Sequence, residues 1–328
     1  MTFGKELHKN FQAQVSGTLT SGPLKEVDLF RCLIRAFMFI PGYKAAEIHG
    51  SRHLVEYVES ENWFSRRPIC ELGDLLIIVF SAEKRQGRLL VMQNKVSRSG
   101  GQLSSSYRSF SANLVQYELL RNRPLFRHVT GLWKGRCNSL IQNTSYSSVC
   151  QYGLFYEGTN NHIDMASMTA GVLDFSSSAI RAKFPLHGRN PTARLAFSPS
   201  KYETFNRRNS ADFEGADNLE DFGDLLHDLY IGRPICLSLK TQISFALMEH
   251  LRLNAGRASP LAEQLIREFS EIDFREDPAE SNFHVPTGGN ELPENIVSTF
   301  RALLLINADM CESNPFGNSQ PHNLRKES

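Results

Sequence analysis

The sequence lacks several features that would identify a class of protein directly. It has no apolar run close to the roughly 20 residues that a membrane helix needs, so we expect no membrane span. The first residues, Met1–His8, lack the apolar core of a signal peptide. The six cysteines are scattered without a C-x-x-C pair, which argues against a zinc site and a disulfide framework. We therefore expect a reduced, cytoplasmic protein.

An excess of charge of one sign is also missing. The chain has 36 Lys and Arg residues against 35 Asp and Glu residues, and its net charge is +1. Such a balance gives no general attraction to nucleic acid or to a membrane, so a surface that binds either one has to be local. With 328 residues, of which 41% are hydrophobic, the chain can build one large domain or two small ones.

Two continuous apolar runs are the most informative feature that is present. Leu75–Phe80 follows Glu71-Leu72-Gly73-Asp74, and Leu89–Met92 leads into Gln93-Asn94-Lys95. Continuous apolarity, in contrast to alternation, is typical of strands that are buried on both faces. The connection over 81–87 is short and charged, which predicts an antiparallel hairpin.

Hydrophobic periodicity and turn residues predict further elements around this hairpin. Their order favours an α/β fold in which helices flank a mixed central sheet. We expect a core over 1–157, a mainly helical C-terminal elaboration over 158–310 packed on that core, and a flexible tail over 311–328. The predicted elements are a helix over 23–39, strands over 45–49 and 54–58, a basic flexible loop over 97–102, a helix over 104–121, a strand over 150–156, helices over 221–230, over 241–253 and from 260, a loop over 277–293, and a strand or helix over 296–306, with 158–217 unassigned.

Polar residues at the ends of the two apolar strands form a candidate site. Asp74 enters the first strand, while Gln93 and Lys95 leave the second, so a hairpin can bring all three to one end of the sheet. Carboxylate, amide and carbonyl oxygens are a ligand set suited to Mg²⁺. A lysine beside them can orient an attacking water or stabilise charge on a phosphate. The alternative is that Asp74 only follows a turn and Lys95 is a solvated charge.

An Asp before a buried strand, a turn, and a second buried strand that ends in Glu/Gln-x-Lys resembles the PD-(D/E)XK (restriction-endonuclease-like) nuclease superfamily, over roughly residues 20–156. The resemblance implies Asp74, Gln93 and the Asn94 carbonyl as metal ligands, in the Gln-x-Lys subtype. It also implies roles for Lys95, for Glu26 on the N-terminal helix and for the extra acid Glu71. Several motifs are similar to a group of bacterial restriction-like or defence proteins: Glu71-x-x-Asp74, Leu90-x-x-Gln93-x-Lys95, Gln116–Phe126, Tyr152-Gly153 and Asp221–Leu226.

Two positions depart from the usual superfamily pattern. Gln93 stands where an acid is usual, so we expect a less negative site that holds its metal more weakly. Gly73, and not a proline, precedes Asp74. Both departures leave open a site that binds without cutting.

The resemblance implies a Mg²⁺- or Mn²⁺-dependent nuclease that hydrolyses DNA phosphodiester bonds in bacterial defence against foreign DNA. The alternative function is a catalytically weak or inactive module with the nuclease fold. Such a module would bind nucleic acid, or a partner protein through its C-terminal half. A homodimer and the choice between DNA and RNA stay open.

Overall fold

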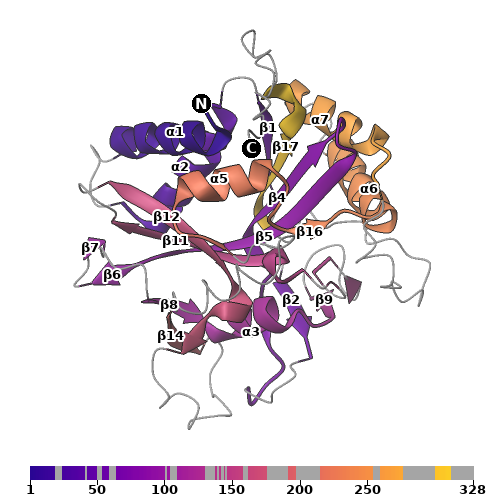
Figure 1. Cartoon of the computed structure of the whole chain (residues 1–328). Helices are drawn as coiled ribbons and strands as arrows, with labels where there is room; N and C mark the ends of the chain where they lie inside the picture. The colour runs from indigo at the N-terminus through magenta and orange to yellow at the C-terminus, as the bar shows by residue number, and fades with distance from the viewer. Residues whose placement is uncertain are drawn as a thin grey trace, which may run out of the picture.

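The computed structural model describes residues 1–18, 24–40, 43–49, 54–58, 64–99, 102–103, 109–129, 137–138, 140–141, 144, 146–157, 162–175, 191–196, 215–253, 259–275 and 300–311. The fold is α/β, with a mixed central sheet flanked by helices (Figure 1). The main sheet has eight strands. Along its path they are β1 (Lys44–His49), β17 (Phe300–Asn307), β4 (Gly73–Ser81), β5 (Gln86–Val96), β11 (Cys150–Glu157), β12 (Ile163–Thr169) and β15 (Gly215–Ala216), with β16 (Arg233–Pro234) pairing with β5 outside this path.

The two apolar runs form the central antiparallel hairpin of this sheet, β4 and β5, as predicted. Every residue of β4 is buried. Its side chains alternate between two apolar clusters: Leu76 belongs to the cluster on one face and Ile77 to the cluster on the other. The prediction of strands buried on both faces is therefore confirmed. At the turn of the hairpin, the Asp309 carboxylate accepts hydrogen bonds from the backbone N–H groups of Ala82 and Glu83.

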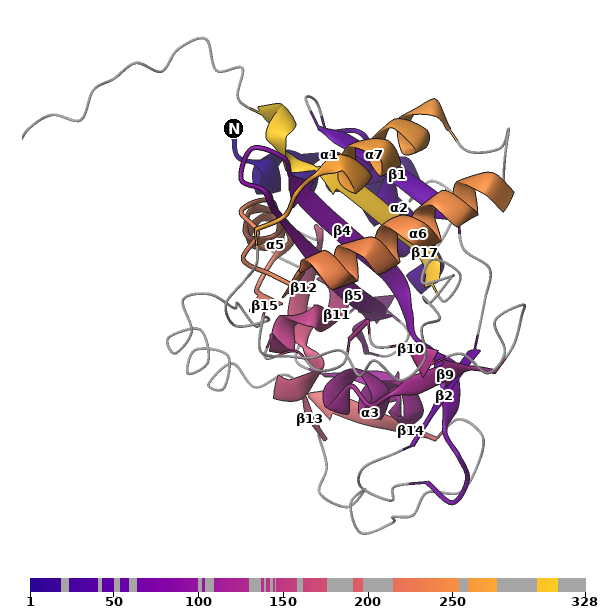
Figure 2. The same cartoon turned by 90° about the vertical axis from the view of Figure 1, so that its right-hand side faces the viewer.

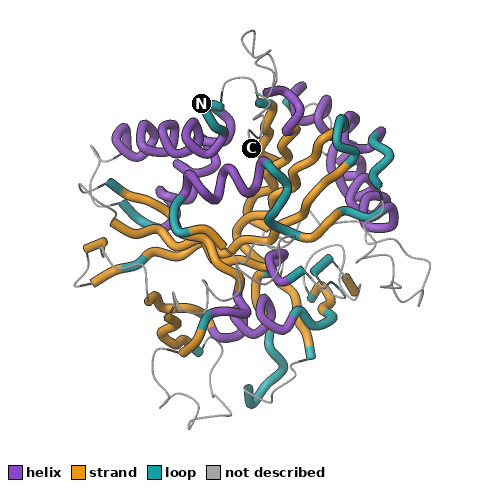
Figure 3. The backbone as a smooth tube through the Cα atoms, in the orientation of Figure 1, coloured by secondary structure: helices purple, strands orange, loops and turns teal. Residues whose placement is uncertain are grey.

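Helices cover both faces of the main sheet (Figures 1 and 3). Their buried side chains assign α1 (Phe3–Thr18), α2 (Glu26–Met38) and α5 (Leu219–His227) to one face. They assign α3 (Leu114–Asn122), α6 (Leu237–Leu253) and α7 (Pro260–Glu271) to the other. Ser259 caps α7 by accepting a hydrogen bond from the Ala262 N–H at 3.1 Å, as its sequence position predicts.

Three smaller sheets accompany the main one, and Figure 2 shows strands of the two larger ones near α3. The four-stranded sheet has the order β10 (Cys137–Asn138), β9 (Phe126–His128), β2 (Leu54–Tyr57) and β3 (Ile69–Glu71). The three-stranded sheet has the order β13 (Asp174–Phe175), β14 (Thr192–Ala196) and β8 (Ser109–Asn113). The two-stranded sheet pairs β6 (Arg98–Ser99) with β7 (Gln102–Leu103). Part of the loop expected over 97–102 is therefore strand.

The helix predicted over 104–121 is wrong in its first half. Its described part begins with a strand, β8, because Phe110 and Ala112 alternate into the core while the strand pairs with β14. The helix, α3, begins only at Leu114, where the Asn113 side chain accepts a hydrogen bond from the Val115 N–H at 2.9 Å. Residues 104–108 lie outside the described residues.

The division predicted at residue 157 does not separate the main sheet from an elaboration. Strands β12, β15 and β17 come from the C-terminal part, which is therefore not only helical, and they pair within the main sheet. Strand β17 lies between β1 and β4 and runs parallel to β4. It closes an edge of β4 that would otherwise present unpaired backbone groups. The loop predicted over 277–293 and the tail beyond Cys311 lie outside the described residues.

Among the cysteines whose side chains the structure describes, Cys32, Cys70, Cys150 and Cys236 carry free thiols. Within the part of the chain that the structure describes, no helix combines the length and the apolarity that a membrane crossing requires.

Candidate active site

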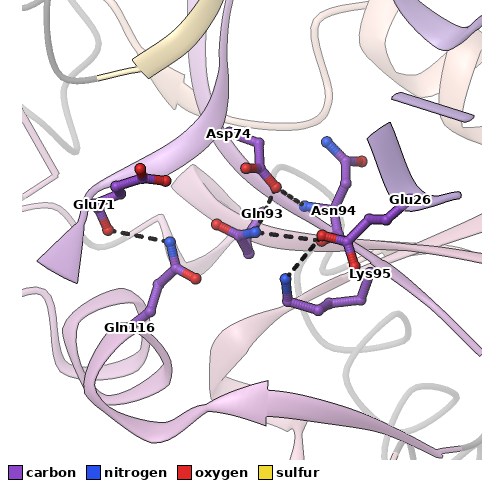
Figure 4. Close-up of polar contacts among 7 residues, drawn as sticks. All are labelled: Glu26, Glu71, Asp74, Gln93, Asn94, Lys95 and Gln116. Atoms are coloured by element: carbon purple, nitrogen blue, oxygen red, sulfur yellow. Dashed lines mark hydrogen bonds and ion pairs between the residues drawn. The ribbon is translucent and has the colours of Figure 1, made fainter. Parts of the chain in front are cut away.

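The candidate residues meet where β4 begins and β5 ends (Figure 4). Asp74 is the second residue of β4, and the register that pairs Leu75 with Met92 places Asp74 opposite Gln93. Side chains directly opposite each other in antiparallel strands lie on the same face. Asp74 and Gln93 are only 2% and 3% exposed, so their polar groups depend on each other and on their neighbours.

Hydrogen bonds join Asp74, Gln93 and Asn94 into one group. Asp74 Oδ2 accepts from the Gln93 side-chain amide and, at 2.9 Å, from the Asn94 backbone N–H. The same Gln93 Nε2 donates to the Asn94 carbonyl oxygen at 3.3 Å. Gln93 Nε2 therefore contacts the two oxygen atoms that were predicted to share a metal ion.

The ligand chemistry of this group fits a hard cation. The Gln93 Nε2 donor stands between the Asp74 carboxylate and the Asn94 carbonyl, while Gln93 Oε1 is buried and has no hydrogen-bond partner among the described residues. Rotating the amide would turn Oε1 toward the same point and complete an all-oxygen set, which suits Mg²⁺ or Mn²⁺. No cluster of three or more His, Cys, Asp or Glu residues among those described could hold a metal. The group supplies one carboxylate and neutral oxygens, so water would have to complete the coordination.

Lys95 lies beside this group in an ion pair with Glu26 (Figure 4). Lys95 Nζ donates to Glu26 Oε1 at 3.2 Å, and the two side chains are 16% and 37% exposed. Glu26 is the first residue of α2, so this helix holds the Lys95 ammonium group. The role that the resemblance implies for Glu26 thus takes the form of a contact from α2 to Lys95.

Glu71 and Gln116 connect the site to helix α3, which lies on the face of the main sheet that α6 and α7 also cover. Glu71 ends β3, and Leu72 alone separates it from β4. Gln116 of α3 is 7% exposed, and its Nε2 donates to the Glu71 carbonyl oxygen at 3.1 Å. The helix thereby supports the backbone that leads into Asp74.

Sequence reasoning assigned no role in the site to two buried residues, Glu118 and Tyr152, although both lie in motifs that carry the resemblance. Glu118 of α3 is fully buried, and its charge acts on the buried thiol of Cys70. Burial raises the pKa of Cys70, and the charges of Glu118 and Glu71 raise it further. The spacing from Leu114 to Glu118, four residues on an apolar helix face, was the available signal.

Tyr152 is the second of these residues. It lies opposite Gln93 in the parallel pairing of β11 with β5, and its ring is 5.3 Å from that of Phe110. Burial raises the pKa of the Tyr152 hydroxyl well above its ordinary value, and Tyr117, Cys70 and Asp74 add to the shift. Tyr152 therefore stays protonated and can only act as a neutral hydrogen-bonding group.

Comparisons of the chain with protein-family models, with curated proteins and with solved structures found no match. The function is therefore inferred from the residues and their geometry.

Proposed function

We propose that the protein is a metal-dependent nuclease that hydrolyses DNA phosphodiester bonds at a site of the PD-(D/E)XK type. The observation that carries the proposal is the contact of one atom, Gln93 Nε2, with both Asp74 Oδ2 and the Asn94 carbonyl, beside Lys95. The order of elements adds support. Helix α2 with Glu26, the β4–β5 hairpin with Asp74 and Gln93, and helix α3 occur along the chain in the order that the resemblance implies.

Under this proposal the buried oxygen atoms bind the metal ion and Lys95 acts on the phosphate or the water. Asp74, the Asn94 carbonyl and a rotated Gln93 amide would hold Mg²⁺ or Mn²⁺, which when bound makes a water more acidic and offsets phosphate charge. Lys95, held by Glu26 at 3.2 Å, stabilises the charge that develops on the phosphate or orients the water. Because Asp74 and Gln93 are buried, their polar groups act in surroundings of lower dielectric constant than bulk water, which strengthens these electrostatic interactions.

Cleavage of plasmid and linear DNA with Mg²⁺, Mn²⁺ or EDTA tests the proposal. We expect cutting only with a divalent cation, and a loss of about 100-fold or more in Asp74→Asn and in Lys95→Met. Lys44→Met is the matched control, because Lys44 also sits in a partly buried ion pair, 3.0 Å from Glu268, on another strand of the sheet. A parallel assay on single-stranded RNA determines which nucleic acid is the substrate.

A second candidate function is a nuclease-fold module that binds DNA or a partner protein without cutting, in the same defence setting. Its support is that the Gln93 amide already bonds to both Asp74 and Asn94, so the group is partly satisfied without a cation. No cutting by the wild type under any metal, with DNA binding unchanged in Asp74→Asn, would favour this module over the nuclease.

A further inference from the structure

A second polar site lies on the four-stranded sheet, outside the group around Asp74. It is an open hollow of about 230 Å³. Its walls come from β2, β9 and the segments next to β2, β3 and β9. The lining residues are Glu56, Tyr57, Val58, Arg67, Leu125, Phe126 and Arg127.

The hollow holds two arginines on one buried acid. Glu56 is 8% exposed, and its Oε1 accepts hydrogen bonds from Arg67 Nη1 at 3.3 Å and from Arg127 Nε. The two arginine side chains are 55% and 48% exposed. Two positive charges against one negative leave an excess of one positive charge in the hollow.

The shared carboxylate orients both guanidinium groups and leaves donors on each of them. Arg127 bonds through Nε and Arg67 through Nη1, and the structure shows no other hydrogen bond from either side chain to the described residues. A guanidinium fork matches the oxygen atoms of a phosphate in a way that a lysine ammonium does not. The arrangement is therefore a preformed anion site.

The rest of the lining is apolar and partly exposed. Val58 is 73% exposed and Leu125 is 47% exposed at the hollow, whereas the side chains of Tyr57 and Phe126 point to the opposite face of the sheet, into the core. Ile69, the partner of Glu56 in the next strand, is 42% exposed. A ligand that fits this combination carries an anionic group beside an apolar body. A nucleotide, with a phosphate attached to a sugar and a flat base, has this character.

The hollow shares a sheet face with Glu71, which lies three residues before Asp74 in the chain. The register pairs Glu56 with Ile69 and with Arg127, and Leu54 with Glu71, so these side chains lie on one face. Glu71 lies two residues beyond Ile69 along β3, a rise of about 7 Å. Glu71 precedes Asp74 by three residues, so the chain runs directly from this face into the candidate active site.

We propose that the Arg67–Glu56–Arg127 hollow binds a nucleotide phosphate, and that in the proposed nuclease it holds a nucleotide that flanks the scissile phosphate. The identity of the strand rests on the proposed function. Binding of the phosphate itself does not, because it needs neither metal nor cleavage.

Fluorescence anisotropy with a short labelled single-stranded DNA in EDTA tests the hollow. We expect Arg67→Ala and Arg127→Ala each to weaken binding about tenfold. Each substitution should also lower the slope of log K against log salt by about 1. Arg127→Lys keeps the charge but loses the fork, so it should recover only part of the affinity. Arg252→Ala removes one charge from an exposed ion pair with Glu249 on α6 and should bind as the wild type does.

The outcomes separate the hollow from the nuclease proposal. Wild-type affinity for DNA in Arg67→Ala and Arg127→Ala, or an equal loss of affinity in Arg252→Ala, would overturn the proposal that the hollow binds phosphate, even if the protein cuts DNA at Asp74. Weakened binding in the two arginine variants supports the hollow even if no metal produces cleavage. Calorimetry with dAMP distinguishes the source of the phosphate: binding as tight as that of the oligonucleotide, lost in the same variants, supports a free-nucleotide ligand for the hollow. Full affinity of Arg127→Lys would overturn the hollow in favour of nonspecific charge attraction.

Discussion

Gln93→Glu tests the site most sharply, because it introduces an acid where the nuclease superfamily of the proposed function usually carries one. In the structure the Gln93 amide donates to Asp74 Oδ2 and to the Asn94 carbonyl. The substitution replaces this donor with a second carboxylate. We expect the variant to be less stable than the wild type without a divalent cation, and to regain stability when Mg²⁺ or Mn²⁺ is added.

The geometry sets the size of the effect. Gln93 and Asp74 are in hydrogen-bond contact and are 3% and 2% exposed, so little water would separate the two carboxylates. Two charges about 4 Å apart repel by about 4 kcal/mol at an effective dielectric constant of about 20. The introduced group can instead keep its proton, which near pH 7 costs about 3–4 kcal/mol for an ordinary pKa of about 4.3. We therefore expect a loss of about 3 kcal/mol at neutral pH, since the protonated group recovers a hydrogen bond to Asp74.

The direction of the pH dependence follows from the same argument. The pKa of the introduced carboxyl group is higher in the folded state than in the unfolded state, so the folded state binds more protons between the two values. The destabilisation relative to the wild type should therefore shrink as the pH falls toward about 4 and grow as the pH rises through the folded pKa.

Urea unfolding followed by circular dichroism, with EDTA or with a divalent cation, measures both effects. A cation at about 100 times its dissociation constant should return about 2.7 kcal/mol to the variant. The matched control is the exchanged pair Asp74→Asn/Gln93→Glu, which keeps one acid and one amide and should unfold within about 1 kcal/mol of the wild type. If the control is as unstable as Gln93→Glu, shape and not charge is the cause. If no cation restores Gln93→Glu, the group does not hold a metal.

Three further predictions concern the support of the site and the sheet. Gln116→Leu removes the hydrogen-bond donor to the Glu71 carbonyl, 3.1 Å away, and should lower the free energy of unfolding by about 1–2 kcal/mol. In the cleavage assay the variant should lower kcat more than it raises KM. An unchanged kcat would show that α3 does not position Asp74. Gly223→Ala should destabilise the protein by about 1–3 kcal/mol in urea unfolding, because its new Cβ would lie 2.7 Å from Gly4 Cα where α5 crosses α1. Gly17→Ala is the control, because its new Cβ would meet no described atom from outside its own stretch of helix within 4 Å. Equal losses of stability in both variants would refute the close packing of α5 on α1. Burial opposes ionisation of Glu268, but hydrogen bonds from Lys44, Asn307 and Gln264 outweigh burial and lower the pKa of Glu268. The stabilising effect of Glu268 should therefore be present above its unfolded pKa and be lost as the pH falls through its folded pKa, so the stability difference between wild type and Glu268→Gln should vanish in acid. A stability difference that stays constant with pH would contradict this role.

Local patterns predicted the parts of the fold whose information is local. The continuous apolarity of 75–80 and 89–92 is sufficient to predict two strands buried on both faces, and the short charged connection makes them a hairpin. The cap at Ser259 and the start of α7 are local for the same reason. Prediction failed over 104–121, since the apolar residues of 109–113 and of α3 together suit a helical period. Only the pairing of β8 with β14 favours the strand.

The candidate site shows the same division. The sequence by itself determined that Asp74 and Gln93 can lie at the same end of one short hairpin, and the register of the structure then sets them opposite each other. It did not determine what holds them. The ion pair of Lys95 with Glu26 and the support of Glu71 by Gln116 join residues that are far apart in the chain.

Only the tertiary structure decided the neighbours of the hairpin. Strand β17 pairs with β4 although more than 200 residues separate them, and strands β2, β3 and β9 bring Glu56, Arg67 and Arg127 into one hollow. Local periodicity states that a strand needs a partner along each edge, but it does not state which distant strand provides one. That choice depends on how all the apolar faces of the chain can be buried together, which is a property of the complete fold.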